Sequence, residues 1–223
     1  TCSAGRAASA DRDGRLMRRL RRVVARVVDP VADALLRAGV SPDAVTVLGT
    51  LGVVVAALTL FPLGHLVLGT LVITVFVLSD LLDGTMARRS GRTSTWGAFL
   101  DSTLDRFGDG AIFTGLVLYL AGRGEDPVGA VLALACLVLG SIVPYARARA
   151  EGLGMRADVG IAERADRLVV VLTTTLGVGL GLPSAVLTVV LGVLALASLV
   201  TVVQRVVHVR RQFLAAGGTA AAP

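Results

Sequence analysis

Long apolar stretches are the feature that most limits what this chain can fold into. Six of them are long enough to span a bilayer core of about 30 Å, which requires roughly 20 helical residues. They lie near residues 44–63, 66–86, 97–121, 127–149, 165–181 and 184–207. Their apolar residues form continuous runs and do not alternate with polar ones as in a β-barrel strand. Backbone groups in lipid must be hydrogen-bonded within the segment, so each stretch predicts a helix. The sequence therefore predicts an all-α integral membrane protein with six transmembrane helices.

The overall composition agrees with a membrane protein. Of the 223 residues, 54% are hydrophobic, and the mean hydropathy is +0.78. Soluble domains usually contain fewer apolar residues and are interrupted more often by charge. The formal net charge of +6 does not indicate nucleic-acid binding, because aromatic residues make up only 4% of the chain and offer few surfaces for base stacking.

The positions of the arginines predict the orientation in the membrane. All 22 basic residues are Arg, and nine of them lie within residues 1–40. Others cluster at 88–92, 147–167 and 205–211, whereas the connections on the opposite side hold only Arg123. Because short cytoplasmic loops are enriched in basic residues, we expect a multi-pass protein of the cell membrane with both termini in the cytoplasm.

The N-terminal and C-terminal regions differ from the apolar domain. Residues 1–14 are small and polar, which predicts disorder. Residues 15–38 place apolar residues on one helical face and Arg on the other, which predicts an amphipathic helix at the membrane interface. Ser41 and Pro42 are suited to start the next helix. We expect a six-helix domain over residues 39–211 and a flexible tail over 212–223.

Four aspartates stand at the predicted cytoplasmic ends of the second and third stretches. Asp80 and Asp83 are three residues apart, and Asp101 and Asp105 are four apart, so each pair lies on one face of its helix. A carboxylate at membrane depth costs at least ~2.5–3.5 kcal/mol. Converging carboxylates repel one another unless cations lie between them, and oxygen ligands suit hard ions such as Mg²⁺. The residues predict a cytoplasmic metal site that can hold phosphates.

Neighbouring residues add to this prediction. Gly84 lacks a side chain, so a ligand or backbone can approach closely there, and Arg88 can bind a phosphate through paired donors. A carboxylate can also remove the proton from an attacking alcohol. Asp109 continues the helical face of Asp105 by one turn, beside Arg106. We interpret Asp109 and Arg106 as a supporting ion pair and place them outside the site.

The residues between Asp80 and Asp105 form the pattern D-x2-D-G-x2-A-R-x8-G-x3-D-x3-D. This pattern resembles the signature of the CDP-alcohol phosphotransferase family, and every specified position is filled. The resemblance implies six transmembrane helices and the transfer of a phosphatidyl-type group from a CDP-linked lipid to an alcohol, with release of CMP. It also implies a homodimer and two bound Mg²⁺ ions, or Mn²⁺ in their place.

The resemblance also implies roles for individual residues. The metal ligands would be Asp80, Asp83, Asp101 and Asp105. Asp105 would in addition accept the proton of the attacking alcohol. The residues that bind CDP-diacylglycerol would be Asp43, Thr46, Gly84, Ala87, Arg88 and Ser94.

Arginines outside the motif bear on the acceptor. Arg147, Arg149, Arg164 and Arg167 lie around a predicted cytoplasmic connection, and Arg205 lies at the cytoplasmic end of the last stretch. Forked guanidinium groups suit a doubly charged phosphate, so these arginines favour an acceptor that already carries a phosphate. The segments "LDGTMAR", "DRFGDGAIF" and "ERADRL" are similar to the bacterial phosphatidylinositol-phosphate synthase branch, which joins CDP-diacylglycerol to inositol phosphate. By this resemblance the acceptor phosphate would be held by Arg147, Arg167 and Arg205, with Arg164 nearby.

Three alternatives stay open at this point. The first is the same reaction with another phosphorylated acceptor, such as glycerol 3-phosphate. The second is an intramembrane prenyltransferase, which also uses aspartate-rich helices and Mg²⁺. The third is a divalent-cation transporter, which would hold its carboxylates near the bilayer midplane on several helices. Testing for CMP release would separate the enzyme classes from the transporter.

Overall fold

The structure is a computed structural model that describes residues 28–91 and 94–215. In this part of the chain it consists of helices joined by turns, without strands. The chain divides into two compact units, one built from Thr1–Gly49 and Leu78–Ser102 and the other from Thr50–Val77 and Thr103–Pro223. We call them unit 1 and unit 2 and describe each by itself. The predicted all-helical class is confirmed.

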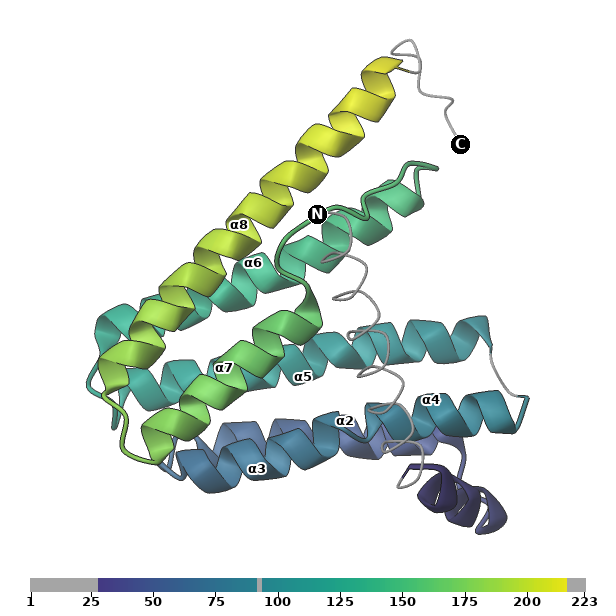
Figure 1. The fold of residues 1–223 in the computed structure, drawn as a ribbon, viewed down its shortest axis with the longest axis horizontal. Coiled ribbons are helices and arrows are strands. Elements are labelled where there is room, and N and C mark those ends of the chain that lie inside the picture. The colour runs from purple at the N-terminus through teal and green to yellow at the C-terminus, as the bar shows by residue number, and fades with distance from the viewer. Residues whose placement is uncertain (1–27, 92–93, 216–223) are drawn as a thin grey trace, which may run out of the picture. The chain divides into compact units, whose positions relative to one another are not determined.

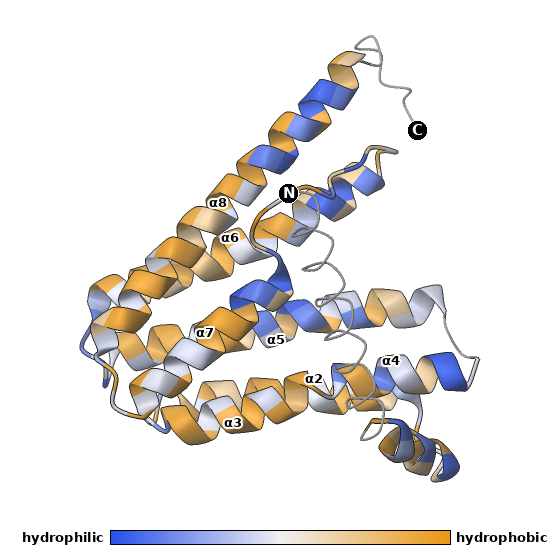
Figure 2. Cartoon of the chain, viewed as in Figure 1, coloured by the Kyte–Doolittle hydropathy of each residue, from blue (hydrophilic) through white to orange (hydrophobic). Residues whose placement is uncertain are grey.

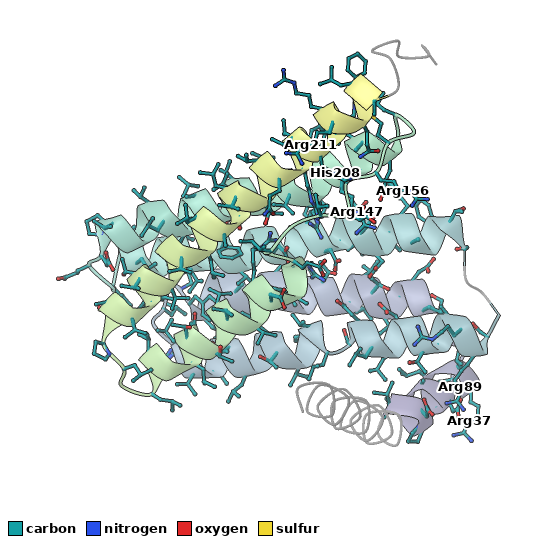
Figure 3. The ribbon with its side chains drawn as sticks, turned by 45° about the horizontal axis from the view of Figure 1, so that its top comes forward. Arg37, Arg89, Arg147, Arg156, His208 and Arg211 are labelled. Carbon is teal, nitrogen blue, oxygen red and sulfur yellow. The ribbon has the colours of Figure 1, made fainter. Side chains whose placement is uncertain are left out.

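Unit 1 holds a helix over residues 28–37, the first turns of α2 (Pro42–Leu60), α4 (Asp80–Arg89) and the start of α5 (Thr95–Ala121). Ser41 caps α2, because its hydroxyl accepts a hydrogen bond from the amide of Ala44 at 3.2 Å. Arg89 forms ion pairs of 3.2 Å with both Asp29 and Asp33. These pairs connect the 28–37 helix to the end of α4, and Figure 3 labels Arg37 and Arg89 on these two elements.

Three of the predicted segments lie wholly or partly outside the described residues. Residues 1–14 lie outside them, as do residues 15–27 of the predicted amphipathic helix and residues 216–223 of the tail. The described part of the amphipathic segment is helical over 28–37. At the other end of the chain, helix α8 continues to Ala215, so residues 212–215 are helical rather than part of a flexible tail.

Unit 2 contains the remainder of α2 and α5 together with α3 (Leu66–Val77), α6 (Pro127–Glu151), α7 (Arg164–Gly179) and α8 (Ser184–Ala215) (Figure 1). Helix α8 packs along α6, and α7 packs against α3 and α8. The core of these contacts is apolar and fully buried. Its largest fully buried members are Phe61, Ile73, Ile112, Phe113, Leu116, Leu120, Val171, Leu187 and Leu191.

A glycine permits the closest helix contact in unit 2. A Cβ at Gly115 of α5 would overlap the backbone carbonyl of Ala57 in α2. Small residues let two helix backbones approach in this way, and such contacts are typical of membrane helices. Gly115 is therefore required by packing, and its position fixes how α5 lies against the second half of α2.

Within the described residues, four helices are long and apolar enough to cross a membrane: Pro42–Leu60, Leu66–Arg89, Pro127–Glu151 and Ser184–Ala215. The second of these joins α3 and α4 across a turn at residues 78–79. The predicted spans at 97–121 and 165–181 are helical as well, as α5 and α7. However, α7 has only 16 residues, and α5 carries several charges in its first half. The structure thus supports a multi-pass membrane protein, and six spans are not confirmed.

Apolar side chains also cover the outer faces of the spans. Val75 of α3, Val131 of α6 and Val189 of α8 are each about two-thirds exposed, at 68%, 65% and 66%. Water would disfavour so many exposed apolar side chains, whereas lipid does not. Figure 2 shows α8 hydrophobic over most of its length, with hydrophilic residues gathered toward its C-terminal end.

Candidate active site

The first aspartate pair lies in the opening turn of α4. Helix α4 begins at Asp80, directly after the turn that separates it from α3. Asp83 is 7% exposed, and its Oδ2 accepts a hydrogen bond from the hydroxyl of Thr46 in α2 at 2.6 Å. Asp80 and Asp101, also in unit 1, act on Asp83 as like charges. A buried carboxylate near two other carboxylates favours binding of a cation.

The second pair lies on α5, with Asp105 one turn after Asp101. Asp101 is exposed. Asp105 belongs to unit 2, where its Oδ1 forms an ion pair of 2.8 Å with Nη1 of Arg164 and its Oδ2 lies 3.7 Å from Nη2 of Arg106. In this structure Asp105 is thus held by arginines of unit 2.

Among the described residues, no three carboxylate, imidazole or thiol groups stand close enough together to enclose a metal ion. The chemistry of the donors nevertheless fits a divalent ion. Asp83 supplies a buried oxygen donor whose neighbours in unit 1 are also carboxylates, and Mg²⁺ and Mn²⁺ prefer such hard oxygen ligands. A bound ion would relieve the repulsion between these like charges.

Residues predicted to bind the CDP-linked lipid lie on α4 and at the starts of α2 and α5. A methyl group at Gly84 would lie 3.4 Å from Nη1 of Arg88, at ordinary van der Waals contact, so the glycine lies beside that guanidinium. Nη2 of Arg88 donates to the hydroxyl of Thr85 at 3.2 Å. Ala87 lies on the same helix and is partly buried. The three specified motif positions that follow Asp83 on α4 are thus two small residues, Gly84 and Ala87, and the exposed Arg88.

Ser94 and Asp43 both make local contacts in unit 1. The Ser94 hydroxyl accepts a hydrogen bond from the Gly97 amide at 3.0 Å and so caps α5. Asp43 accepts one from the indole nitrogen of Trp96 at 3.2 Å. Trp96 was not among the predicted site residues, although it is 58% exposed next to the cap. An exposed tryptophan at a predicted membrane interface is a signal that could have identified it.

The predicted acceptor arginines divide into two groups in unit 2. Arg164 and Arg167, at the start of α7, meet at Asp109 of α5. Nε of Arg164 donates to Oδ1 of Asp109 at 2.9 Å, and Nη2 of Arg167 donates to Oδ2 at 3.4 Å. Arg167 is 1% exposed. Asp109 therefore fixes both arginines, although its place in the sequence predicted only a supporting ion pair with Arg106 outside the site.

Arg167 has buried donors that the described residues leave without a hydrogen-bond partner, namely Nε and Nη1. It lines a cavity of about 20 Å³ together with Arg106, Ser141 and Gly140. A space of this size holds about one water molecule. The Arg167 guanidinium thus lies next to room for a water, and a phosphate would need a larger opening than this structure has.

Arg147 and Arg205 form the second group, near enough for their charges to interact. Arg147 is exposed, and its Nε donates to Glu151 at 2.8 Å. Arg205 is buried in α8, where Nε donates to the carbonyl of Val159 at 2.9 Å and Nη1 donates to that of Val143. The structure therefore brings the four arginines together in pairs, each pair already bound to protein groups.

Comparison with known proteins identifies the family. The family model for CDP-alcohol phosphatidyltransferases matches residues 39–161. This chain belongs to the CDP-alcohol phosphatidyltransferase family. The match contains all four motif aspartates and the Thr46–Asp83 contact.

Curated relatives of this transferase extend over most of its length. It is 53% identical over 194 residues to a phosphatidylinositol phosphate synthase of Cutibacterium acnes, covering 84% of this chain and 94% of the relative. It is 50% identical over 203 residues to the Streptomyces avermitilis protein of the same name, covering 88% and 83%. The chain therefore matches these proteins well beyond the motif.

Solved structures show the same fold. The crystal structure of Mycobacterium tuberculosis phosphatidylinositol phosphate synthase with CDP-DAG bound matches this transferase with a TM-score of 0.79 at 44% identity, covering 83% of this chain and 94% of that one. The same mycobacterial enzyme in complex with manganese and citrate matches with a TM-score of 0.77 at 44% identity, covering 82% and 88%. That enzyme thus binds a divalent metal.

Proposed function

We propose that this transferase moves the phosphatidyl group of CDP-diacylglycerol to inositol phosphate, which yields phosphatidylinositol phosphate and CMP. The observation that carries the proposal is the identity of about half of all residues with curated phosphatidylinositol phosphate synthases over more than four-fifths of each chain. The family match argues against a prenyltransferase or a transporter.

The aspartates would supply the reacting centre. We propose that Asp80, Asp83, Asp101 and Asp105 hold two Mg²⁺ ions, which when bound would screen the diphosphate and polarise its phosphorus. The hydroxyl of the acceptor attacks the phosphorus that carries the diacylglycerol. The bond from that phosphorus to the oxygen of CMP breaks, and CMP leaves. Asp105 takes the proton of the attacking hydroxyl.

The donor lipid would be bound by residues of unit 1. We propose that Arg88 pairs with a phosphate of the CDP group and that Gly84 and Ala87 let the nucleotide lie close to α4. Thr46, Asp43 and Ser94 would complete this pocket. The exposed guanidinium of Arg88 and the hydrogen bond between Thr46 and Asp83 support this assignment.

The acceptor phosphate would be bound by Arg147, Arg164, Arg167 and Arg205. Arg164 supports this proposal most directly, because it contacts Asp105, the proposed proton acceptor, at 2.8 Å. A phosphate held there would bring the acceptor hydroxyl near that carboxylate. Arg147 and Arg205 are bound to Glu151 and to backbone carbonyls, so acceptor binding would replace some of these contacts.

We further propose the topology predicted from the arginines. Residues 39–211 would form the catalytic domain with six spans in the cell membrane, including α5 and α7. Both termini and the aspartates would face the cytoplasm, and residues 15–38 would lie along the membrane surface. The protein would act as a homodimer.

The test of the function is CMP release by the purified protein with CDP-diacylglycerol and Mg²⁺. Inositol phosphate, free inositol, glycerol 3-phosphate and serine would be compared as acceptors, each also with EDTA or Mn²⁺. CMP that forms only with inositol phosphate and a divalent ion supports the proposal. CMP that forms with glycerol 3-phosphate instead would keep the family reaction and reject the proposed acceptor.

A further inference from the structure

The connection between α6 and α7 is hydrogen-bonded to the C-terminal half of α8. The hydroxyl of Thr201 accepts hydrogen bonds from the amides of Ile161 at 3.2 Å and Ala162 at 3.1 Å. Farther along the helix, Gln212 exchanges two hydrogen bonds with the backbone of Arg156, at 3.0 and 2.6 Å. These contacts hold the connection as a fixed wall beside α8.

A groove of about 610 Å³ lies between this wall and α8. Its lining is mostly apolar and includes Ile161, Leu199, Val203 and Val207, with His208 and Arg211 at the end nearer the C-terminus. A helix rises 1.5 Å per residue, so the lining along α8 extends for about 18 Å. The groove has the volume of a small-molecule site, about 300–1,000 Å³, in the long shape that suits a hydrocarbon chain.

The groove also lies at the level where a lipid headgroup would meet its acyl chain. Helix α8 has 32 residues, about 48 Å at 1.5 Å per residue, whereas the bilayer core is about 30 Å thick. Its hydrophilic C-terminal end therefore extends into the headgroup region (Figure 2). Figure 3 shows His208 and Arg211 on this part of α8.

The basic end of the groove is complementary to an anionic lipid. Arg211 is exposed and His208 is partly buried, and within residues 28–91 and 94–215 neither one pairs with a carboxylate. We propose that this groove binds one anionic phospholipid of the bilayer, with an acyl chain along Leu199, Val203 and Val207 and the phosphate at Arg211 and His208. None of the residues proposed to bind the CDP group, the metal ions or the acceptor phosphate lines it.

The test compares the lipids that stay bound to the purified protein. Wild type would be placed in nanodiscs with equal amounts of phosphatidylglycerol and phosphatidylcholine, extracted into detergent, and its retained lipids counted by native mass spectrometry. Arg211→Glu reverses the charge at the basic end, and Val203→Trp fills the apolar part. Arg210→Glu is the matched control, because Arg210 is exposed on the adjacent position and does not line the groove.

We expect wild type and Arg210→Glu to retain one phosphatidylglycerol in preference to phosphatidylcholine. Arg211→Glu should reduce this preference roughly fivefold or more, because each basic residue near an anionic lipid surface raises the binding affinity by about fivefold. Val203→Trp should lose the bound lipid of either kind. Equal retention of the two lipids by wild type, or the same loss in both Arg variants, would overturn the proposal. A Val203→Trp protein that turns monomeric with unchanged lipid would assign the groove to a second copy of the chain.

Discussion

Asp109 accepts a hydrogen bond from Nε of Arg164 at 2.9 Å, and the same guanidinium contacts Asp105 through Nη1 at 2.8 Å. Arg164 thus bridges two carboxylates that are one turn apart on α5. The other oxygen of Asp109 lies 3.4 Å from Arg167. The proposed proton acceptor and two arginines proposed to bind the acceptor phosphate are therefore positioned by one buried carboxylate.

Replacing Asp109 by Asn should weaken acceptor binding. Both arginines would lose a charged partner, and hydrogen bonds to charged groups contribute about 1.5–3 kcal/mol each. We expect KM for inositol phosphate to rise roughly 10- to 100-fold, with KM for CDP-diacylglycerol nearly unchanged. Steady-state CMP release with one substrate varied at a time measures both. Asp166→Asn, an exposed position on α7, is the control, and equal changes in the two KM values would contradict the positioning role.

The hydroxyl of Thr46 should matter for metal binding. It donates to the buried Asp83 at 2.6 Å, and partners that orient a metal ligand typically change metal affinity 10- to 100-fold when they are removed. Thr46→Val should raise the Mg²⁺ concentration for half-maximal CMP release by about tenfold or more. Thr59→Val, at an exposed position whose hydroxyl bonds its own helix, should leave that concentration unchanged. An unshifted Mg²⁺ dependence in Thr46→Val would remove Asp83 from the proposed ligands.

Two glycines on α5 should respond in opposite ways to Ala. A Cβ at Gly115 would overlap the carbonyl of Ala57, whereas a Cβ at Gly110 would meet no atom within 4 Å. Gly115→Ala should lower the free energy of unfolding by about 1–3 kcal/mol, as overpacking does. Gly110→Ala should raise it by up to about 1 kcal/mol through helix propensity. Thermal unfolding in detergent compares them, and an unchanged Tm in Gly115→Ala would refute the close contact.

The cap of α6 should make stability depend on pH. The hydroxyl of Thr188 and then the amide of Gly129 donate to the Asp126 carboxylate and lower its pKa. A carboxyl group with a lowered pKa stabilises the fold above its unfolded value of about 3.9, and this stabilisation is lost as the pH falls through the folded pKa. Thr188→Val should therefore lower Tm at pH 7, by an amount that shrinks below about pH 4.

The control for this cap is Thr174→Val. Its hydroxyl bonds the carbonyl of Val170 in its own helix and contacts no titrating group, so its effect on Tm should be the same at both pH values. A Tm difference between wild type and Thr188→Val that does not narrow in acid would show that the carboxylate charge plays no part in the cap.

Local patterns in the sequence predicted much of the fold. The spacing of Asp80 and Asp83 placed them on one helix face, and both lie in the first turn of α4. Ser41 was predicted to cap α2 from its residue type and the following Pro42, and it does. These features depend on neighbours within a few residues, which is why a single sequence reveals them.

Contacts between distant segments were not predicted. Asp109 contacts Arg164 and Arg167, which lie more than fifty residues later in the sequence. The spacing of four residues from Asp105 predicted only that the two aspartates share a helical face. The burial of Arg167 was also missed, because Gly140, whose Cβ would lie 3.2 Å from the guanidinium carbon, opens the space for it. An arginine near a predicted cytoplasmic loop can either bind a phosphate or only set the membrane topology, and the sequence could not separate these two roles.

The most direct test of the central claim is the product itself. Purified protein would be given CDP-diacylglycerol, Mg²⁺ and inositol phosphate labelled in its ring, and the label that enters organic-extractable lipid would be counted beside the CMP released. Asp105→Asn, which removes the proposed proton acceptor, serves as the inactive comparison. We predict one labelled lipid for each CMP with wild type and neither with the variant. CMP released without labelled lipid would contradict transfer to inositol phosphate.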